Sequence, residues 1–467
     1  MAEALAYVIT TTPPESYATD RRYQRVLLVV VMLAVTAFGS LMTLITVALD
    51  DMGADLGASR VTMTWAITGL MLIMAVATPM AGTLGDVHGH RKVLLIGLLG
   101  GAVATFLCGL AWNAPSLIFF RVLFGLFAAM VNPNAMSLMM HAYGAERRAT
   151  AVGWFQFAVT GAPTLGLIAG GPLIDATGWR AIFFVFAGVS LIAFLVGAPL
   201  LRPMPRQVGR PLDVRGATSL GLGVLGVLLT ITELVSGRFG LLLVVWVAVA
   251  IGFLANFVHV ERTVAAPMLK LEYLHRREFS MPLLSAAAVQ FAYMGGFVIT
   301  PALLSRRYGW TTGAIALLMM PRPGAFSVAS LAGGWLPSRI GFRWPIMIGA
   351  LSMAASMIAF AAASPLTGAV GIGLIVLGLV LSGVASGISQ PSVAAMSVNA
   401  VDEADLGIAN GMNQQMIFVG IVAGIQTMNV LVGESSDSAR FVQTYLVGLG
   451  FALVGFVFAS LAKDVPR

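Results

Sequence analysis

The chain has 467 residues, of which 58% are hydrophobic and 10% are charged, whereas soluble domains carry about 25% charged residues. This composition excludes an ordinary soluble protein and predicts an all-α polytopic membrane protein embedded in a lipid bilayer. The net charge of +7 comes from short Arg and Lys clusters between apolar runs, which indicates membrane topology and no nucleic acid partner. With Cys108 as the one cysteine, we expect no internal disulfide, no metal site built on cysteines and no cofactor.

Apolar runs of about 20 residues, long enough to cross a hydrocarbon core about 30 Å thick, recur along the chain. They predict fourteen transmembrane helices, at residues 26–49, 62–82, 93–112, 116–139, 151–174, 181–201, 217–236, 240–260, 280–303, 312–335, 345–364, 367–390, 407–432 and 441–462. If the N-terminus is cytoplasmic, 19 of the 27 Lys and Arg residues lie on the cytoplasmic side and 6 on the outer side. The positive-inside rule therefore places both termini in the cytoplasm, with the protein in the inner (cytoplasmic) membrane of the cell.

The longest connections between these helices, 202–216 and 261–279, bracket a pair of helices that we interpret as an insert. The predicted organisation is a cytoplasmic segment 1–25, a six-helix half 26–201, a linker 202–216, a two-helix insert 217–260, a linker 261–279, a second six-helix half 280–462 and a tail 463–467. A weak repeat supports the two halves, because GTLGDVHGHRK and GGWLPSRIGFR each follow the second helix of a half. Repeated halves around a central cavity are typical of secondary transporters with alternating access.

The loop after the second predicted helix reads Gly82-Thr-Leu-Gly-Asp86-Val-His-Gly89-His90-Arg91-Lys92. Its glycines permit a tight turn, and Asp86 can accept hydrogen bonds from cations or a helix N-terminus of the other half. It resembles the loop signature of the major facilitator superfamily, G-x-L-a-D-r-x-G-r-r, with Val87 and His90 where arginines are usual. The resemblance implies a breakable latch formed by Gly82, Asp86, Gly89, His90 and Arg91. The alternative is an ordinary charged loop that sets topology.

The fourth predicted helix contains Leu117-Ile-Phe-Phe-Arg121-Val-Leu-Phe-Gly125. Arg121 lies about six residues, or roughly 9 Å, into the span, where a charge is costly unless it faces a cavity or a partner. The stretch resembles the second signature of the same superfamily, which implies that Arg121 and Gly125 take part in proton coupling. An arginine that reaches outward to the lipid headgroups is the alternative.

The fifth predicted helix contains Gly161-Ala-Pro163-Thr-Leu-Gly166-Leu-Ile-Ala-Gly170-Gly171. This stretch resembles the superfamily signature of antiporters, except that Ala162 replaces a glycine. Glycines about four residues apart allow close helix packing, and Pro163 bends the helix. The resemblance favours export over symport and assigns a coupling role to Pro163, Gly166, Gly170 and Gly171, while a purely structural packing face explains the same residues.

Two further stretches, Trp179-Arg-Ala-Ile-Phe-Phe and Met320-Pro-Arg322-Pro-Gly, resemble the fourteen-helix drug/proton antiporter branch. Arg322 lies about ten residues into its span, between two prolines that free backbone carbonyls. It either caps those carbonyls or binds an acidic group of a substrate.

The first predicted helix departs from that branch. Leu41 occupies the position where relatives often carry a membrane-embedded Asp, and Asp50 replaces a later proline. Proton coupling normally requires a carboxylate that titrates between two access states. The remaining candidates lie near the outer ends of spans: Asp50, Asp51, Asp175 and Glu233. Solvated loop carboxylates are the alternative interpretation.

Substrate recognition is expected on apolar, Met-rich and aromatic walls with few polar groups, which suit varied lipophilic ligands. The predicted cavity residues are Trp65, Gln156, Tyr293, Arg322 and Asn413. The chain lacks a phosphate-binding loop and an embedded acid pair, so we predict no enzymatic activity. The resemblance implies a multidrug-type exporter of lipophilic or amphipathic small molecules driven by proton antiport. The alternatives are an exporter of one endogenous lipidic or anionic metabolite, and a non-transporting receptor or scaffold.

Overall fold

Every element in the described part of the chain is helical. The computed structural model describes residues 20–143, 148–203, 214–235, 239–264, 271–401 and 406–464. Among these residues, thirteen helical segments of 19 to 35 residues, with residues 312–340 taken as one, are apolar and long enough to cross a membrane. The chain is therefore a multi-pass membrane protein. 

The helices of the N-terminal part are α3 (Arg21–Asp55), α4 (Arg60–His88), α5 (His90–Gly109), α6 (Ala114–Tyr143), α7 (Arg148–Thr177) and α8 (Arg180–Leu200). Those that follow are α9 (Val214–Val235), α10 (Leu241–Thr263), the 3-10 helix η2 (Leu271–His275), α11 (Arg277–Tyr308), α12 (Thr312–Leu318), α13 (Pro321–Ile340), α14 (Arg343–Ala363), α15 (Ala369–Asn399), α16 (Leu406–Val432) and α17 (Ser438–Leu461).

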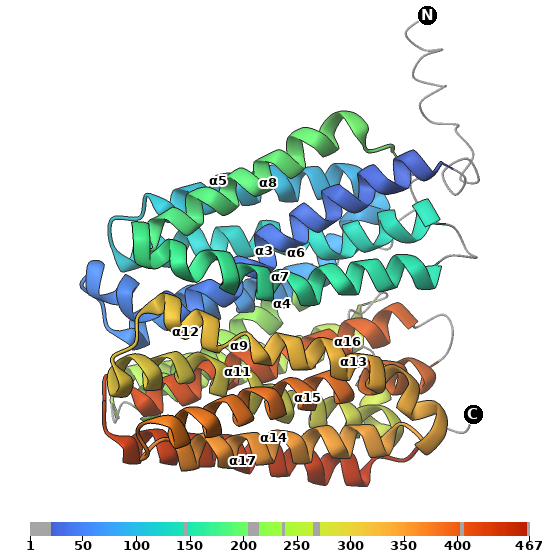
Figure 1. Cartoon of the computed structure of the whole chain (residues 1–467). Coiled ribbons are helices and arrows are strands. Elements are labelled where there is room, and N and C mark those ends of the chain that lie inside the picture. The colour runs from blue at the N-terminus through green and yellow to red at the C-terminus, as the bar shows by residue number, and fades with distance from the viewer. Residues whose placement is uncertain are drawn as a thin grey trace, which may run out of the picture.

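Two bundles lie side by side. Helices α3 to α8 pack on one another as the N-terminal bundle, and α11 to α17 pack as the C-terminal bundle. Figure 1 shows the first, blue to green, stacked on the second, yellow to red. A cluster of buried apolar side chains fills each bundle, and the seam between the bundles is crossed mainly where α4 meets α16 and where α7 meets α12 and α13.

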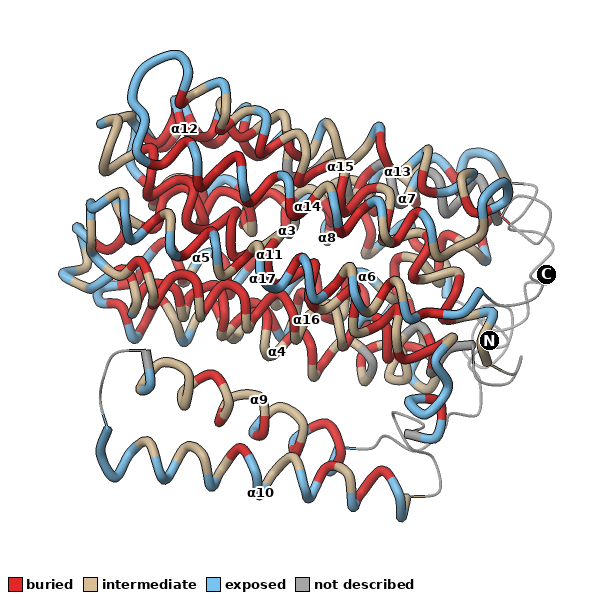
Figure 2. Tube along the Cα trace, turned by 90° about the horizontal axis from the view of Figure 1, so that it is seen from below, coloured by how far each residue is buried: buried red, intermediate tan, exposed pale blue. Residues whose placement is uncertain are grey.

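Helices α9 and α10 stand beside the two bundles, as Figure 2 shows. Helix α9 packs on α4 of one bundle and on α16 of the other. The amide of Gln426 on α16 donates to Thr232 Oγ1 on α9 at 2.7 Å, and Asn256 on α10 donates to Ser219 on α9 at 2.7 Å. Most of α10 is exposed, which leaves its apolar side chains for lipid.

Short-range capping fixes where the long helices begin and turn. The Asp20 carboxylate accepts the N–H groups of Arg22 and Tyr23 at the start of α3, and Ser59 caps α4 through the N–H of Thr62. Gly89 alone separates α4 from α5 and adopts φ 95°, a conformation that favours glycine. The helix α3 extends beyond the predicted span 26–49 because polar residues continue it at both ends.

One predicted helix, 312–335, is broken. Helix α12 ends at Leu318 and α13 starts at Pro321, so the regular hydrogen-bond ladder is interrupted between them, while Met319 and Met320 keep backbone angles in the α region. The prolines at positions 321 and 323 explain the break, because they lack the N–H that would continue the hydrogen-bond ladder. 

Candidate functional site

The bundles meet through a polar cluster at the end where α3 finishes and α4 begins, which we call the Arg60 end; the opposite end is the Gly89 end. Arg60 is 2% exposed. Its guanidinium donates to Asp50 Oδ1 at 2.5 Å, to Asn429 Oδ1 at 3.0 Å and to the Val298 carbonyl at 2.7 Å. Its backbone N–H donates to the Glu434 carboxylate. Arg60 thus ties α4 to α11 and α16 of the C-terminal bundle.

A second arginine reaches the same cluster from the C-terminal bundle. Arg306 of α11 contacts Asp50 Oδ1 at 3.4 Å and Glu434 Oε2 at 3.1 Å. It also donates to the carbonyls of Gly433 and Ser435 at 2.8 and 3.1 Å. Asp50 therefore contacts a guanidinium from each bundle.

Two carboxylates of the N-terminal bundle hold the first turn of α12. Asp175, near the end of α7, accepts Thr311 Oγ1–H at 2.8 Å and the Gly313 N–H at 2.9 Å. Asp51 accepts the hydroxyl of Thr312. A helix N-terminus carries partial positive charge, which carboxylates stabilise. Three of the four predicted proton carriers, Asp50, Asp51 and Asp175, thus lie in contacts between the bundles.

The glycines of the antiporter-like stretch divide between two neighbours. A Cβ added at Gly171 would lie 2.5 Å from Ala316 Cβ and 3.3 Å from Gly313 Cα, so α7 and α12 approach too closely for a larger residue. Gly166 and Gly170 instead face α3 within the N-terminal bundle. One stretch therefore serves both internal packing and the seam.

At the Gly89 end, the contacts of the predicted latch stay within the N-terminal bundle. Asp86 Oδ1 lies 3.2 Å from His90 Nε2, and His90 Nδ1 lies 2.8 Å from Asn134 Oδ1. Arg91 donates to the Ala198 carbonyl of α8 at 2.7 Å. His90 therefore partners Asp86 across the Gly89 turn. In the part of the chain that the structure describes, no ion pair joins the bundles at this end.

Arg121 is buried in α6, with 1% exposure, so it does not reach outward as an exposed side chain. Its Nε donates to the Ala66 carbonyl at 3.1 Å, its guanidinium lies 5.1 Å from the Phe124 ring centre, and its Nη2 has no partner. Gly125 in the next turn lets α6 approach α4, because a Cβ there would meet the Leu70 carbonyl at 2.9 Å.

Arg322 is buried at the start of α13, with 3% exposure. Its guanidinium lies 3.5 Å from the ring centre of Tyr293 and 4.0 Å from that of Phe297, both on α11. Nη2 donates to the Tyr293 carbonyl at 2.9 Å, while Nε has no partner. None of the ion pairs between described residues involves Arg121 or Arg322.

The other predicted residues are spread along the seam and beyond it. Trp65 packs, partly buried, against the core of the N-terminal bundle. Asn413 of α16 is 3% exposed and its Oδ1 has no partner. Glu233 lies on α9, outside both bundles. The side chains of Gln156 and Pro163 lie outside the described residues.

Four members of the polar cluster are not among the residues predicted from the sequence, namely Arg60, Arg306, Asn429 and Glu434. The two arginines belong to the outer-side Lys and Arg residues, which the sequence interpretation uses for topology alone. Arg60 instead begins α4, and Arg306 lies in the last turn of α11. One sequence signal could have found this cluster. Acidic residues and arginines lie at neighbouring helix ends on the predicted outer side, and no acidic residue lies deeper within a predicted span.

Comparison with known proteins identifies the family of this chain. The model of the Major Facilitator Superfamily matches residues 27–425. The chain is 28% identical, over 90% of its length and 78% of the relative's, to a tetracenomycin C resistance and export protein of Streptomyces glaucescens. It is 27% identical, over 82% and 71% of the two lengths, to the multidrug resistance protein Stp of Mycobacterium tuberculosis.

A solved structure agrees on the fold. A bacterial homolog of the human lysosomal transporter Spinster superposes with a TM-score of 0.68 over 96% of this chain and 100% of that chain, at 16% identity. This likeness shows the fold alone. The matched family model and the similar export proteins indicate a transporter and not an enzyme. The chain belongs to the Major Facilitator Superfamily and is a multi-pass membrane transporter.

Proposed function

We propose that this transporter exports lipophilic or amphipathic small molecules from the cytoplasm by proton antiport with alternating access. Drug and antibiotic exporters among its relatives support the direction and the substrate class. We also propose that the chain crosses the membrane fourteen times, through the thirteen apolar segments and α7, and that it belongs to the fourteen-helix drug/proton antiporter branch. The distribution of Arg and Lys supports a cytoplasmic position for both termini and for the Gly89 end, with the protein in the cell membrane.

The observation that carries the proposal is the polar seal at the Arg60 end. Arg60, Asp50 and Arg306 join the bundles by ion pairs and hydrogen bonds, which can break and re-form without unfolding either bundle. Alternating access requires such a reversible contact at one end while the other opens. We infer that the structure is closed on the outer side, and that the two bundles rock about the seam.

Asp50, Asp51 and Asp175 are the proposed proton carriers. Their carboxylates hold cross-bundle contacts, and protonation would remove the negative charge on which those contacts depend. Glu233 lies on α9, outside both bundles, so we rank it below these three as a proton carrier. The buried Arg121 and the latch residue Asp86 complete the proposed coupling machinery.

The test is transport in liposomes with an imposed pH gradient and a panel of fluorescent lipophilic compounds. We expect gradient-dependent movement that an uncoupler abolishes. Asp86→Asn and Arg121→Gln should each lose flux by at least about tenfold while the protein elutes as a folded monodisperse species, because a charge-assisted contact contributes about 1.5–3 kcal/mol. Absence of movement for the whole panel would refute the export proposal.

A second candidate substrate class is an anionic metabolite. Arg121 and Arg322 place two guanidinium groups in the membrane interior. Each has one nitrogen without a hydrogen-bond partner, and neither arginine forms an ion pair with a described acidic residue. Buried charge is costly until it is paired, so a substrate acid could supply the missing partner. The rings of Tyr293 and Phe297 add a surface for an aromatic substrate.

Paired probes separate the two classes. Binding of 1-naphthoate and of its uncharged amide is compared by intrinsic fluorescence in wild type and in Arg322→Gln. The anionic candidate predicts that wild type prefers naphthoate and that Arg322→Gln removes the preference. Arg339→Gln is the matched control, since Arg339 lies on the same helix, exposed and 5.1 Å from the Trp335 ring centre. Equal binding of both probes by wild type would reject an anionic substrate.

A further inference from the structure

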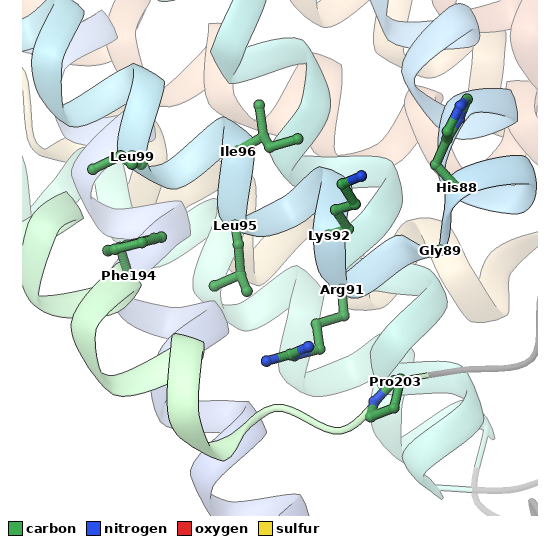
Figure 3. A pocket seen from close by; sticks show the side chains of 9 residues that line it. All are labelled: His88, Gly89, Arg91, Lys92, Leu95, Ile96, Leu99, Phe194 and Pro203. Atoms are coloured by element: carbon green, nitrogen blue, oxygen red, sulfur yellow. The ribbon is translucent and has the colours of Figure 1, made fainter. Parts of the chain in front are cut away.

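A groove runs along the outer surface of the N-terminal bundle at the Gly89 end, between α5 and α8. Its volume is about 320 Å³, and Figure 3 shows its lining side chains. The lining is divided by chemistry: basic residues occupy the end of the groove nearest the Gly89 turn, and apolar residues follow along α5 and α8. It lies away from the polar cluster at the Arg60 end, so it is distinct from the proposed transport machinery there.

Three basic side chains line one end of the groove, namely His88, Arg91 and Lys92. Arg91 is held in place because it donates to the Ala198 carbonyl at 2.7 Å, one of the last-turn carbonyls of α8 that lack a helical partner. Its Nε has no partner, and Lys92 is exposed. No acidic residue is among the described residues that line the groove. The end is therefore electropositive.

The first turn of α5 adds to this positive potential. Gly89 caps α5 and has no side chain, so the cap contributes no hydrogen bond to the helix N–H groups. Helix N-termini carry partial positive charge and expose N–H groups that suit phosphate oxygens. The helix end and the two cations Arg91 and Lys92 thus lie at the same end of the groove.

The remainder of the groove is apolar and exposed. Leu95, Ile96 and Leu99 follow the basic turn on α5, and Phe194 faces them from α8. Ile96 and Leu99 are 45% and 40% exposed. From Arg91 to Leu99 the helix rises about 12 Å, which is most of the roughly 15 Å depth of one leaflet. An extended hydrocarbon chain fits a surface of this length and composition.

We propose that this groove binds an anionic phospholipid, with its phosphate at Arg91 and Lys92 and an acyl chain along Leu95, Leu99 and Phe194. Charge complementarity selects the occupant, because a basic pocket at a membrane interface favours anionic headgroups. A zwitterionic lipid of equal chain length gains the same apolar contact but less from the cations. The proposal requires only that the chain spans a membrane, and it does not depend on the transported substrate.

The test compares dioleoyl phosphatidylglycerol with dioleoyl phosphatidylcholine, which differ in headgroup alone. Delipidated full-length protein is titrated with each lipid, and bound lipid is counted by native mass spectrometry. We expect wild type to prefer phosphatidylglycerol by roughly tenfold to thirtyfold, as two basic residues at a lipid surface predict. Arg91→Gln combined with Lys92→Gln should reduce the preference to within about twofold. Lys92→Gln alone, at an exposed position, should reduce it about fivefold.

The control removes the same amount of charge elsewhere. Arg339 and Arg343 lie where α13 ends and α14 begins in the C-terminal bundle, outside the groove. The double variant Arg339→Gln and Arg343→Gln should keep the wild-type preference for phosphatidylglycerol. Equal retention of both lipids by wild type would overturn the proposal, as would an equal loss of preference in the control variant. If the double variant at Arg91 and Lys92 fails to fold, the wild-type comparison and Lys92→Gln decide the question.

Discussion

At the scale of single residues, Gly89 shows how one backbone conformation positions a motif. It ends α4 and begins α5, with φ 95° and without any intervening loop residue. The turn brings Asp86 and His90 within 3.2 Å of each other across it. The sequence motif predicted the tight turn correctly, but it did not predict the partner of His90, because Asn134 comes from another helix.

Substitution of two glycines of the motif should separate turn geometry from packing. Gly89→Ala should lower the free energy of unfolding by about 1–3 kcal/mol, because a residue with a Cβ rarely adopts φ 95° with ψ 124°. Gly82→Ala should be nearly neutral, because its Cβ would have one neighbour, Pro133 Cβ at 3.9 Å. Thermal melting of both variants in detergent measures the difference. Equal melting temperatures would contradict this assignment.

Asp20 should make the anchoring of α3 dependent on pH. The N–H of Tyr23 and the guanidinium of Arg202 hold the pKa of Asp20 below its ordinary value of 3.8. Its contribution is therefore present above pH 3.8 and is lost as pH falls through the lowered pKa. Melting of wild type and Asp20→Ala should differ most near neutral pH and converge in acid. A difference that persists in acid would show that the carboxylate charge is not responsible.

At the scale of elements, the broken span α12–α13 is the main departure from the predicted helices. Apolar length predicted one helix over 312–335, since hydropathy does not register a missing N–H. The prolines around Arg322 carried the local signal for a break. The carboxylate contacts that hold α12 were unpredictable, because Asp175 lies 138 positions before Gly313 in the chain.

Removing the Asp175 charge should loosen α12. Asp175→Asn weakens the contact with the helix N-terminus, so we expect faster hydrogen–deuterium exchange in the first turn of α12, by several-fold up to about tenfold. Asp55→Asn is the control at the same end, since Asp55 pairs with Arg180 inside the N-terminal bundle. Exchange that increases equally in both variants would contradict a specific role for Asp175.

At the scale of the whole molecule, the membrane architecture was largely predictable and the seam was not. Long apolar runs predicted a polytopic helical transporter because each run satisfies its own backbone hydrogen bonds in lipid. Cross-bundle contacts instead depend on residues such as Arg60 and Asn429, separated by 369 positions. No local pattern links them, so the three-dimensional structure was needed to bring the cluster together.

Loss of Arg60 should open the seam at its end. Arg60→Gln removes charged hydrogen bonds to Asp50, Asn429 and the Val298 carbonyl, which contribute about 1.5–3 kcal/mol each. Val298 is fully buried in the structure. A cysteine introduced there as Val298→Cys should react with a membrane-impermeant maleimide at least about tenfold faster in the Arg60→Gln background than with Arg60 present.

Two controls make that labelling experiment specific. Native Cys108 is buried and gives the background rate. Arg180→Gln breaks an ion pair with Asp55 inside the N-terminal bundle and should leave labelling unchanged. Unchanged labelling in Arg60→Gln would show that Arg60 does not hold the seam closed.

The arrangement around Asp50 also determines what each bundle retains when the seam parts. Asp50 and Arg60 both belong to the N-terminal bundle, while Arg306 and Glu434 both belong to the C-terminal bundle. Separation breaks the links between these two pairs and leaves each pair intact. Neither of these two pairs is left with an isolated charge, so they avoid the desolvation cost that makes broken buried ion pairs unfavourable. The cost of opening this end then lies in its cross-bundle hydrogen bonds, such as those of Arg60 to Asn429 and the Val298 carbonyl.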